Sequence, residues 1–345
     1  MSVQKPLKNR IGRIVEAGKT DFIEREISSI ESDQVVIKVA YSAICGSDLH
    51  IFHGKHPSVK LPTTIGHELS GEIVETGDKV KNVKIGDRVT LEPCIVCGQC
   101  EACKSGNYNF CENISFTYRN GDGAMANYVV AQGQHVFKLP DSITLRNGCL
   151  IEPLSVATHA VRKADIRLGQ SALVIGVGAI GLFITALLKR SGCSEITAVD
   201  FNDQHLKLAK ELGATSVINS KNEDFEKRIN EITNNKGYDR SFEAVGKQST
   251  FVQAMLSLKK NGLMTDIGIF EEPNIMIPAS RFVTHEIRIQ GAQGYCNDFP
   301  IAIEMAKQID LNKFITYEFK LDQLQQALET ANDRDKNAIK VVVKP

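Results

Sequence analysis

The sequence predicts a two-domain α/β protein, in which a β-rich domain is followed by a doubly wound parallel sheet. The chain has 345 residues, and a prior of about 150 residues per domain gives about two domains. Up to about residue 150, short β-like runs alternate with turn residues, whereas from residue 171 onward apolar strands alternate with helical stretches. Strand–helix alternation of the second kind calls for a parallel sheet covered by helices on both faces.

The first part of the chain is predicted to be mostly β. Runs rich in Val and Ile occur at residues 35–39, 71–75 and 88–91, and turn residues follow at 76–78 and precede the last run at 85–87. Short strands joined by tight turns are the structure that this composition favours.

The second part is predicted to alternate strands with helices. We expect helices such as 182–190 and 203–212, and strands at 172–175, 195–199, 216–218, 240–244, 263–267 and 287–290. The end of the chain predicts amphipathic helices at 299–308 and 321–332 and a final strand at 338–343. The pattern alone does not assign this tail to either domain.

Charge and hydropathy exclude several kinds of partner. The chain carries 41 Lys and Arg against 41 Asp and Glu, and both nucleic acids and anionic membranes favour a basic excess. The polar first ten residues lack the apolar core of a signal peptide. Residues 172–188 are uncharged and near the length of a membrane span, but their spaced glycines favour a strand, a tight turn and a buried helix. We therefore expect no nucleic acid and no membrane as partner.

A glycine motif marks the first turn of the second domain. Gly176, Gly178 and Gly181 lie between a predicted strand and a predicted helix, and Asp200 ends the next strand. In such a loop the first glycine permits the turn, the second lets backbone amides approach a pyrophosphate, and the third lets helix and strand pack closely. Asp200 can accept both hydroxyls of a ribose and repels a 2′-phosphate, which favours NAD over NADP. The alternative is a buried loop in which the glycines only form the turn.

Five of the nine cysteines lie within one short stretch: Cys94, Cys97, Cys100, Cys103 and Cys111. Four thiolates around one Zn²⁺ complete a tetrahedral site and can fold a loop that has little else to pack. Such a zinc is structural, because no position remains for a substrate. Spacing excludes neither Cys94 nor Cys111 from the four, and reduced thiols or a disulfide are the alternative.

A second, sparser set of residues is a candidate reaction centre. Cys45 and His67 follow β-like segments, and a carboxylate, Glu68 or Glu152, would complete the three protein ligands typical of a catalytic zinc. By spacing alone, a Cys and a His twenty-two residues apart are more often core-packing or surface residues than a pair of metal ligands. Packing or surface roles are expected for the other histidines considered, His53, His56, His135, His159 and His285.

Taken together, these residues resemble the zinc-containing medium-chain dehydrogenase/reductase superfamily over essentially the whole chain. The similar segments, closest to the polyol branch of sorbitol (L-iditol) dehydrogenase and its relatives, are CGSDLH at 45–50, GHELSGEIVETG at 66–77, GDRVTLEP at 86–93, IEPLSVATHA at 151–160 and GYCNDFPIAI at 294–303. Many alcohol dehydrogenases of the superfamily have a zinc-ligating cysteine at the position of Glu152. The resemblance implies a GroES-like catalytic domain over residues 1–155, with 296–345 folded back onto it, and a Rossmann NAD-binding domain over 156–295.

The resemblance also implies roles for individual residues. Cys45, His67 and Glu68 then bind a catalytic zinc, Glu152 lies beside the metal and can exchange with Glu68 or hold the substrate, and Asp48 orients the zinc-binding histidine. A structural zinc is implied at Cys97, Cys100, Cys103 and Cys111, which leaves Cys94 as a spare thiol. Tyr295 is implied near the substrate, and the residues implied near NAD, besides the glycines, are Ile180, Asp200, His205, Ile267, Gly268 and Ile269.

The implied reaction moves hydride from a secondary alcohol to NAD and gives a ketone, in the cleft between the domains. Zinc would lower the pKa of the substrate hydroxyl, Ser47 would accept its proton, and His50 would pass the proton to the surface. Three positions depart from sorbitol dehydrogenase: Gly294 and His205 replace arginines, and Ile51 replaces a tyrosine. The loss of the arginine and the tyrosine from the pocket favours a different polyol, a sugar acid, a vicinal diol or an amino alcohol as substrate.

Two alternatives remain at this level. One is a zinc dehydrogenase of an amino alcohol or vicinal diol, similar to threonine 3-dehydrogenase or butanediol dehydrogenase; the other is a non-enzymatic NAD- and zinc-binding redox sensor. The resemblance further implies about two zinc ions per chain. It also implies a homo-oligomer, dimer or tetramer, and a cytoplasmic location.

Overall fold

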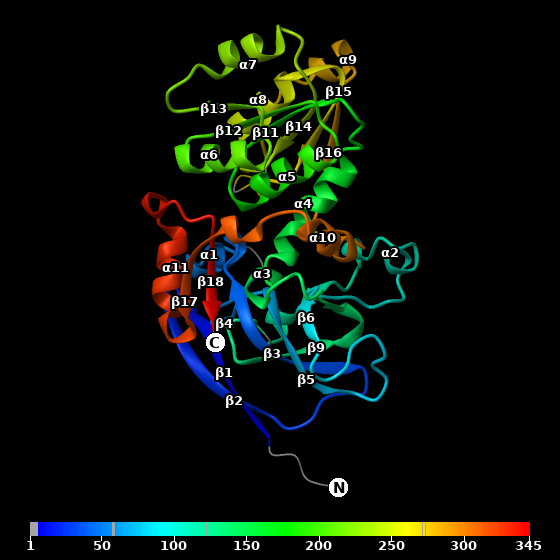
Figure 1. The fold of residues 1–345 in the computed structure, drawn as a ribbon, viewed down its shortest axis with the longest axis vertical. Coiled ribbons are helices and arrows are strands. Elements are labelled where there is room, and N and C mark those ends of the chain that lie inside the picture. The colour runs from blue at the N-terminus through cyan, green and yellow to red at the C-terminus, as the bar shows by residue number, and fades with distance from the viewer. Residues whose placement is uncertain (1–5, 57–58, 122, 271, 273) are drawn as a thin grey trace. The chain divides into compact units, whose positions relative to one another are not determined.

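The computed structural model describes residues 6–56, 59–121, 123–270, 272 and 274–345 (Figure 1). The chain forms two compact units, one of Met1–Glu152 with Phe299–Pro345 and one of Pro153–Asp298. The boundaries between the units therefore lie at 152/153 and 298/299, three residues before and three residues after the predicted boundaries 155/156 and 295/296. The α/β fold class is confirmed, since one unit is built on mixed sheets and the other on a parallel sheet.

The main sheet of the first unit uses both ends of the chain. Its strand order is β10 (Val136–Lys138), β6 (Arg88–Leu91), β5 (Glu68–Thr76), β3 (Gln34–Ala43), β18 (Lys340–Lys344) and β17 (Ile315–Lys320), with β9 (Tyr128–Gln132) also paired to β3. The final strand β18 runs antiparallel to β3, with Val342 opposite Ala43. The C-terminal tail, which the sequence pattern left unassigned, is therefore part of the first unit.

A hairpin that the sequence analysis did not predict forms a second sheet. Its strands β1 (Leu7–Glu16) and β2 (Lys19–Ile27) pair antiparallel, and β1 also pairs with β4 (Thr63–Thr64). Gly18 permits the tight connection, because its φ of 78° is disfavoured for other residues. A third, two-stranded sheet, β7 (Cys94–Ile95) with β8 (Ser115–Phe116), forms the base of the cysteine-rich stretch.

Helices interrupt the β structure of the first unit more than the sequence predicted. The two helices predicted near the C-terminus are present as α10 (Phe299–Ala306) and α11 (Leu324–Asn332), the latter preceded by the 3₁₀ turn η5 (Leu321–Gln323). Not predicted were α1 (Gly46–Phe52), α2 (Glu101–Lys104) and α3 (Leu145–Gly148), with the 3₁₀ turns η1 (Tyr108–Phe110), η2 (Thr117–Asn120), η3 (Gly133–His135), η4 (Leu311–Phe314) and η6 (Arg334–Lys336). Most of these are a single turn long, too short for a periodic apolar pattern to appear.

The second unit is a parallel sheet between two layers of helices. The strand order is β13 (Ser216–Asn219), β12 (Glu195–Asp200), β11 (Ser171–Ile175), β14 (Tyr238–Glu243), β15 (Leu258–Asp266) and β16 (Arg288–Gly291). Figure 1 shows α5 (Ala179–Arg190) and α6 (Asp203–Leu212) along one face, and α7 (Phe225–Thr233) and α8 (Gln248–Leu256) along the other. Two further helices are α4 (Ile151–Lys163), which leads into this unit, and α9 (Ser280–Thr284).

Residues 172–188 form the strand β11, a glycine turn and most of α5, as predicted. Among the described residues, no helix has both the length and the apolar character needed to cross a membrane. One predicted strand was too short: β15 begins at Leu258 rather than at 263. The polar residues Lys259, Lys260 and Asn261 hide its start in the sequence, because they are exposed and the pairing with β14 shifts register there.

Candidate active site and metal centres

Strand pairing brings Cys45, His67 and Glu68 together. Ala43 at the end of β3 lies opposite Glu68 at the start of β5, so the residues just beyond the two strand ends become neighbours. One ligand atom from each of Cys45, His67 and Glu68 lies within 4.8 Å of the others. His67 and Glu68 are buried, and Cys45 is half-buried. The register of the sheet thus assembles a thiol, an imidazole and a carboxylate in the first unit.

Asp48 fixes the two loops that carry these residues. Its buried carboxylate accepts hydrogen bonds from the amide of Cys45, at 2.9 Å, and from the amide of Gly66, at 3.1 Å. The same carboxylate lies 3.8 Å from Nδ1 of His67. Gly66 has a φ of 90°, a conformation that a side chain would strain, so glycine is needed immediately before His67. Asp48 therefore holds both the Cys45 loop and the His67 loop in place.

The site is built to hold a cation. Nδ1 of His67 and Oε2 of Glu68 are buried and find no hydrogen-bond partner in the described part of the chain. Burial of the His67 ring acts to lower its pKa, but Cys45, Asp48 and Glu152 around it raise that pKa well above its usual value. A group of acidic side chains that favours a proton on its histidine also favours a metal ion in place of that proton. Thiolate, imidazole and carboxylate are the donors that Zn²⁺ prefers, so the residues fit this metal.

Two further charged groups border these three side chains. Glu152, the second residue of α4, is buried and acts electrostatically on His67. Lys340, on β18, is buried, and its ammonium lies against the carboxylate of Glu68. Glu152 was predicted at this site. Lys340 was missed, because only the pairing of β18 with β3 reveals that the tail reaches the site.

The predicted proton carriers lie on α1. Ser47 and His50 are both half-buried, and their spacing of three residues places them on the same face of the helix. Tyr118, which sequence analysis also missed, has its ring centroid 5.7 Å from that of His67, and Phe116 stacks on Tyr118. Nothing in the spacing of Tyr118 indicates this contact. These two rings form an apolar wall beside the candidate ligand His67.

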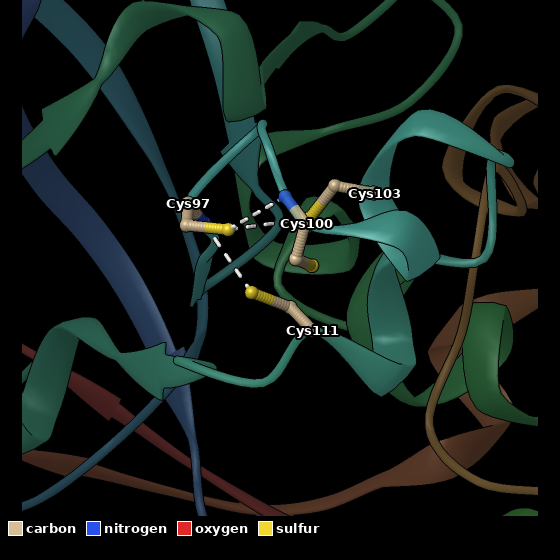
Figure 2. A group of neighbouring side chains, drawn as sticks. All are labelled: Cys97, Cys100, Cys103 and Cys111. Atoms are coloured by element: carbon tan, nitrogen blue, oxygen red, sulfur yellow. Dashed lines mark hydrogen bonds between the residues drawn. The ribbon is translucent and has the colours of Figure 1, made fainter.

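The four cysteines Cys97, Cys100, Cys103 and Cys111 converge in the first unit (Figure 2). Sγ of Cys97 lies 4.0 Å from Sγ of Cys103, and the amide of Cys97 donates to Sγ of Cys111 at 3.3 Å. Backbone amides of Gln99 and Cys100 lower the pKa of Cys97 to about 6, whereas burial and the neighbouring thiols raise that of Cys103 to about 12. Four sulfurs this close together cannot easily all be ionised without a cation between them. They fit a tetrahedral Zn²⁺, because the ion displaces the protons of the thiols that bind it.

The structure places Cys94 apart from these four sulfurs. Spacing left either Cys94 or Cys111 as the extra thiol, and it is Cys111 that shares a group with Cys97, Cys100 and Cys103. Cys94 instead lies with Glu92 and His135. His135 was expected only to pack, as was His159, and each lies beside a carboxylate, Glu92 and Asp298 respectively.

In the second unit, the glycine loop is shaped for a phosphate. A Cβ on Gly176 would lie 2.4 Å from a methyl group of Val245, and one on Gly181 would lie 1.9 Å from the carbonyl oxygen of Gly176. Over Gly178, by contrast, a Cβ would meet no atom of the described residues within 4 Å. Gly178 precedes the first turn of α5, whose amides and dipole favour negative charge. The loop therefore fits the pyrophosphate of a dinucleotide.

The other residues predicted to bind NAD lie at the carboxyl ends of the strands of the same unit. Asp200 ends β12, and its carboxylate accepts the amides of Val177 at 2.9 Å and Phe201 at 2.8 Å. Gly268 follows β15, and a Cβ there would lie 2.2 Å from the carboxylate of Glu243. Ile180 is half-buried in α5, His205 is half-buried in α6, Ile267 is half-buried and Ile269 is exposed. Tyr295, which was predicted near the substrate rather than NAD, is buried. The roles of these residues remain predictions.

Known proteins with similar sequences point to the same chemistry as these observations. Residues 31–141 match the alcohol dehydrogenase GroES-like domain, and residues 179–308 match the zinc-binding dehydrogenase domain. Sorbitol dehydrogenase of Bacillus subtilis (strain 168) is 35% identical over 325 residues, which cover 92% of each chain. The chain belongs to the zinc-binding dehydrogenase family.

Other members of the family are similar to the same degree. L-threonine 3-dehydrogenase of Caldanaerobacter subterraneus subsp. tengcongensis is 35% identical over 90% of this chain and 91% of its own. The crystal structure of 2R,3R-butanediol dehydrogenase from Bacillus subtilis superposes with a TM-score of 0.88 at 33% identity, over 98% of this chain and 99% of its own. The percentage of identity alone does not separate these relatives, but most of the curated relatives compared are named for a polyol or a sugar acid, which supports a polyol dehydrogenase.

Membership in the zinc-binding dehydrogenase family confirms the predicted superfamily, the predicted oxidoreductase activity and the predicted use of zinc and NAD. A dehydrogenase needs a reaction centre, and the group Cys45, His67 and Glu68 has the chemistry of one. The alternative of a non-enzymatic redox sensor is therefore not retained.

Proposed function

We propose that this zinc-binding dehydrogenase oxidises a secondary alcohol of a polyol or sugar-derived substrate to a ketone, with NAD as hydride acceptor. The observation that carries the proposal is the convergence of Cys45, His67 and Glu68, with two buried polar atoms that lack a partner among the described residues. The similarity to sorbitol dehydrogenase supports a polyol as the substrate class.

Each residue of the reaction centre has a proposed task. Cys45, His67 and Glu68 would hold the catalytic zinc, which when bound acts as a Lewis acid on the substrate hydroxyl. Asp48 keeps the two ligand loops at a fixed separation through the amides of Cys45 and Gly66. Glu152 lies close enough to share this site and would accept a hydrogen bond from a hydroxyl of the substrate.

The helix α1 would carry the proton away. Ser47 would accept the proton that the substrate hydroxyl loses, and His50, one turn further along α1, would pass it to solvent. Such a relay typically contributes 10²–10⁴-fold to the rate. The apolar rings of Tyr118 and Phe116 would exclude water from the side of His67.

NAD rather than NADP is the proposed cofactor. Asp200 already orders the glycine loop through the amide of Val177, and its charge at the end of β12 opposes a 2′-phosphate. Gly176, Gly178 and Gly181 would hold the pyrophosphate, and Ile180, His205 and the segment 267–269 would border the rest of the cofactor.

A second zinc would be structural. Cys97, Cys100, Cys103 and Cys111 present four sulfurs and offer no position for a substrate. With the catalytic zinc, this gives about two zinc ions per chain from these two sites.

A vicinal diol or an amino alcohol is the second candidate substrate. Gly294, with a φ of 58°, occupies the position where sorbitol dehydrogenases have an arginine, and Tyr295 beside it is buried. A pocket without that guanidinium has less reason to prefer a long polyol. The similarity to threonine and butanediol dehydrogenases supports this candidate.

The test is a substrate panel followed by NADH absorbance. Sorbitol, xylitol, L-idonate, 2,3-butanediol and L-threonine are compared at equal concentration with the zinc-loaded enzyme. Cys45→Ala and His67→Ala should abolish turnover while NAD binding, followed by fluorescence, stays near that of the unaltered protein. Cys193→Ala, a buried cysteine in the other unit, is the matched control. Full turnover in either variant, or after complete chelation, would refute the proposal.

We further propose a homo-oligomer and a cytoplasmic location, both by analogy with relatives. Light scattering coupled to gel filtration measures the first, and a monomer would contradict it. Microscopy of the tagged full-length chain tests the second.

A further inference from the structure

A third group of metal-binding side chains lies outside both proposed zinc sites. Glu92, Cys94 and His135 bring one ligand atom each within 4.8 Å of the others. Their exposed fractions are 2%, 3% and 7%, so all three are more deeply buried than most of the cysteines at the four-sulfur site. Neither the resemblance nor the proposed reaction gives these three residues a role.

Backbone pairing fixes the three positions. The amide of Glu92, just beyond β6, donates to the carbonyl of His135 at 2.9 Å, where β10 pairs with β6. Cys94 lies opposite Phe116 in the small β7–β8 sheet, and the amide of Thr117 donates to the carbonyl of Pro93 at 3.0 Å. Three separate segments are thus held in register, which is the preorganisation that a metal site requires.

The side chains around the group leave room and one unused polar atom. Glu92 accepts a hydrogen bond from the hydroxyl of Tyr108 at 2.7 Å, and Nδ1 of His135 lies 3.4 Å from its other oxygen. A cavity of about 170 Å³ is lined by Glu92, Cys94, His135 and Thr117. The hydroxyl oxygen of Thr117 is buried and meets no hydrogen-bond partner within the described ranges. A buried hydroxyl without a partner is costly, so this cavity has a reason to hold a ligand.

We propose that Glu92, Cys94 and His135 form a third divalent metal site, suited to Zn²⁺. The set of a thiolate, an imidazole and a carboxylate is the same as at Cys45, His67 and Glu68. Binding would release the thiol proton of Cys94, and the two anionic ligands would then neutralise the charge of the ion inside the protein. The hydroxyl of Thr117, or a water in the cavity, supplies the fourth ligand.

The site would anchor the cysteine-rich stretch. Glu92 directly follows β6 and His135 directly precedes β10, two strands of the main sheet, whereas Cys94 and Thr117 lie at the base of the stretch that carries the four sulfurs. An ion shared between them ties that base to the sheet. The expected consequence is structural, because the reaction centre uses other residues.

The experiment counts zinc in the full-length protein by mass spectrometry after equilibrium dialysis against buffered zinc alone. The unaltered protein should hold about one zinc more than the two sites described above provide, about three per chain. Glu92→Gln, Cys94→Ala and His135→Gln should each lose about one zinc relative to the unaltered protein. Cys193→Ala should keep the full number. Because the result is a difference between variants, it does not depend on whether the proposed reaction is correct.

Two controls keep the result decisive. If Cys94→Ala unfolds the cysteine-rich stretch, it loses a second zinc, whereas His135→Gln, outside that stretch, should lose only one. Thermal unfolding with and without zinc gives a second readout, in which zinc should stabilise His135→Gln less than it stabilises the unaltered protein. A zinc content that is the same in the unaltered protein, in His135→Gln and in Glu92→Gln would overturn the proposal, and the three side chains would then form only a hydrogen-bonded core.

Discussion

The ammonium group of Lys340 lies against the carboxylate of Glu68, and both side chains are buried. The last strand, β18, makes this contact possible, since it pairs with β3 beside the start of β5. Burial acts to lower the pKa of Lys340, but Glu68 and Cys45 raise it well above its usual value. The C-terminal strand therefore places a lasting positive charge next to a proposed zinc ligand.

Lys340→Met should destabilise the metal-free protein by about 3 kcal/mol, because it leaves the carboxylate of Glu68 buried without a counter-ion. Urea unfolding of the chelated protein measures this loss. Lys344→Met, an exposed lysine of the same strand, is the control and should change stability little. Zinc should restore part of the loss in Lys340→Met by replacing the missing positive charge. An equal loss with and without zinc would argue against Glu68 as a ligand.

Asp48→Asn should weaken zinc binding at the candidate reaction centre by about 10–100-fold. The substitution removes the charge near His67 and one of the two acceptors for the amides of Cys45 and Gly66. Competition with a chromogenic chelator measures the affinity. Asp21→Asn, whose aspartate pairs with Arg13 at the surface, should bind zinc as the unaltered protein does. Unchanged affinity in Asp48→Asn would mean that the two loops hold their positions without it.

Asp200→Ala should lower kcat/KM for NAD by about tenfold or more, the effect of about 1.4 kcal/mol lost from the ribose contacts. The preference for NAD over NADP should shrink as well, because the charge that opposes a 2′-phosphate is gone. Initial rates with both cofactors test this. Since Asp200 also accepts the amides of Val177 and Phe201, Asp200→Asn serves as a structural control that keeps an acceptor. An unchanged cofactor preference in the alanine variant would remove Asp200 from the site.

Asp298→Asn should destabilise the protein at neutral pH by about 2 kcal/mol, a value reduced from that of a fully buried pair because Arg162 is half exposed. Burial alone would raise the pKa of Asp298, but His159, the amide of Cys296 and Arg162 hold it below its usual value. A lowered pKa adds stability above the pKa of the unfolded chain, and this stability is lost as the pH falls through the folded pKa.

The gap between Asp298→Asn and the unaltered protein should therefore close at acidic pH. Unfolding midpoints measured from pH 7 down to pH 3 test the sign. The control is Asp165→Asn, since that aspartate is exposed and its ion pair with Arg167 is at the surface. A gap that stays constant over this range would contradict the assigned charge interaction.

Strong local patterns in the sequence predicted most of the second unit. The strand β12 has an apolar run, and the helix α6 that follows it has an N-cap at Asn202 and a regular apolar face. The bounds of both elements were predicted to within one residue. The hairpin of β1 and β2 was missed because charged residues interrupt both strands and leave no long apolar run. The beginning of β15 was missed for a related reason, its exposed lysines.

Long-range pairing decided what sequence alone could not. Cys45 and His67 become neighbours only through the strand register that sets Ala43 opposite Glu68. The spacing of residues along the sequence does not predict that register. The resemblance to a family predicted that Cys45 and His67 bind the same metal. It gave no role to Lys340, Tyr118 or the group around Cys94. Such contacts depend on which strand ends and loops the fold places side by side.

The pairing of β18 with β3 has a consequence for biosynthesis. The second unit is a continuous segment and can fold while the ribosome is still translating the chain, but the first unit lacks a central strand until β18 has been synthesised. Lys340 is translated long after Glu68, so a nascent chain at first holds Glu68 without its counter-ion. Completion of the reaction centre is thereby deferred until β18 pairs with β3, and a protein truncated before β18 would retain the folded second unit beside an unfinished first unit.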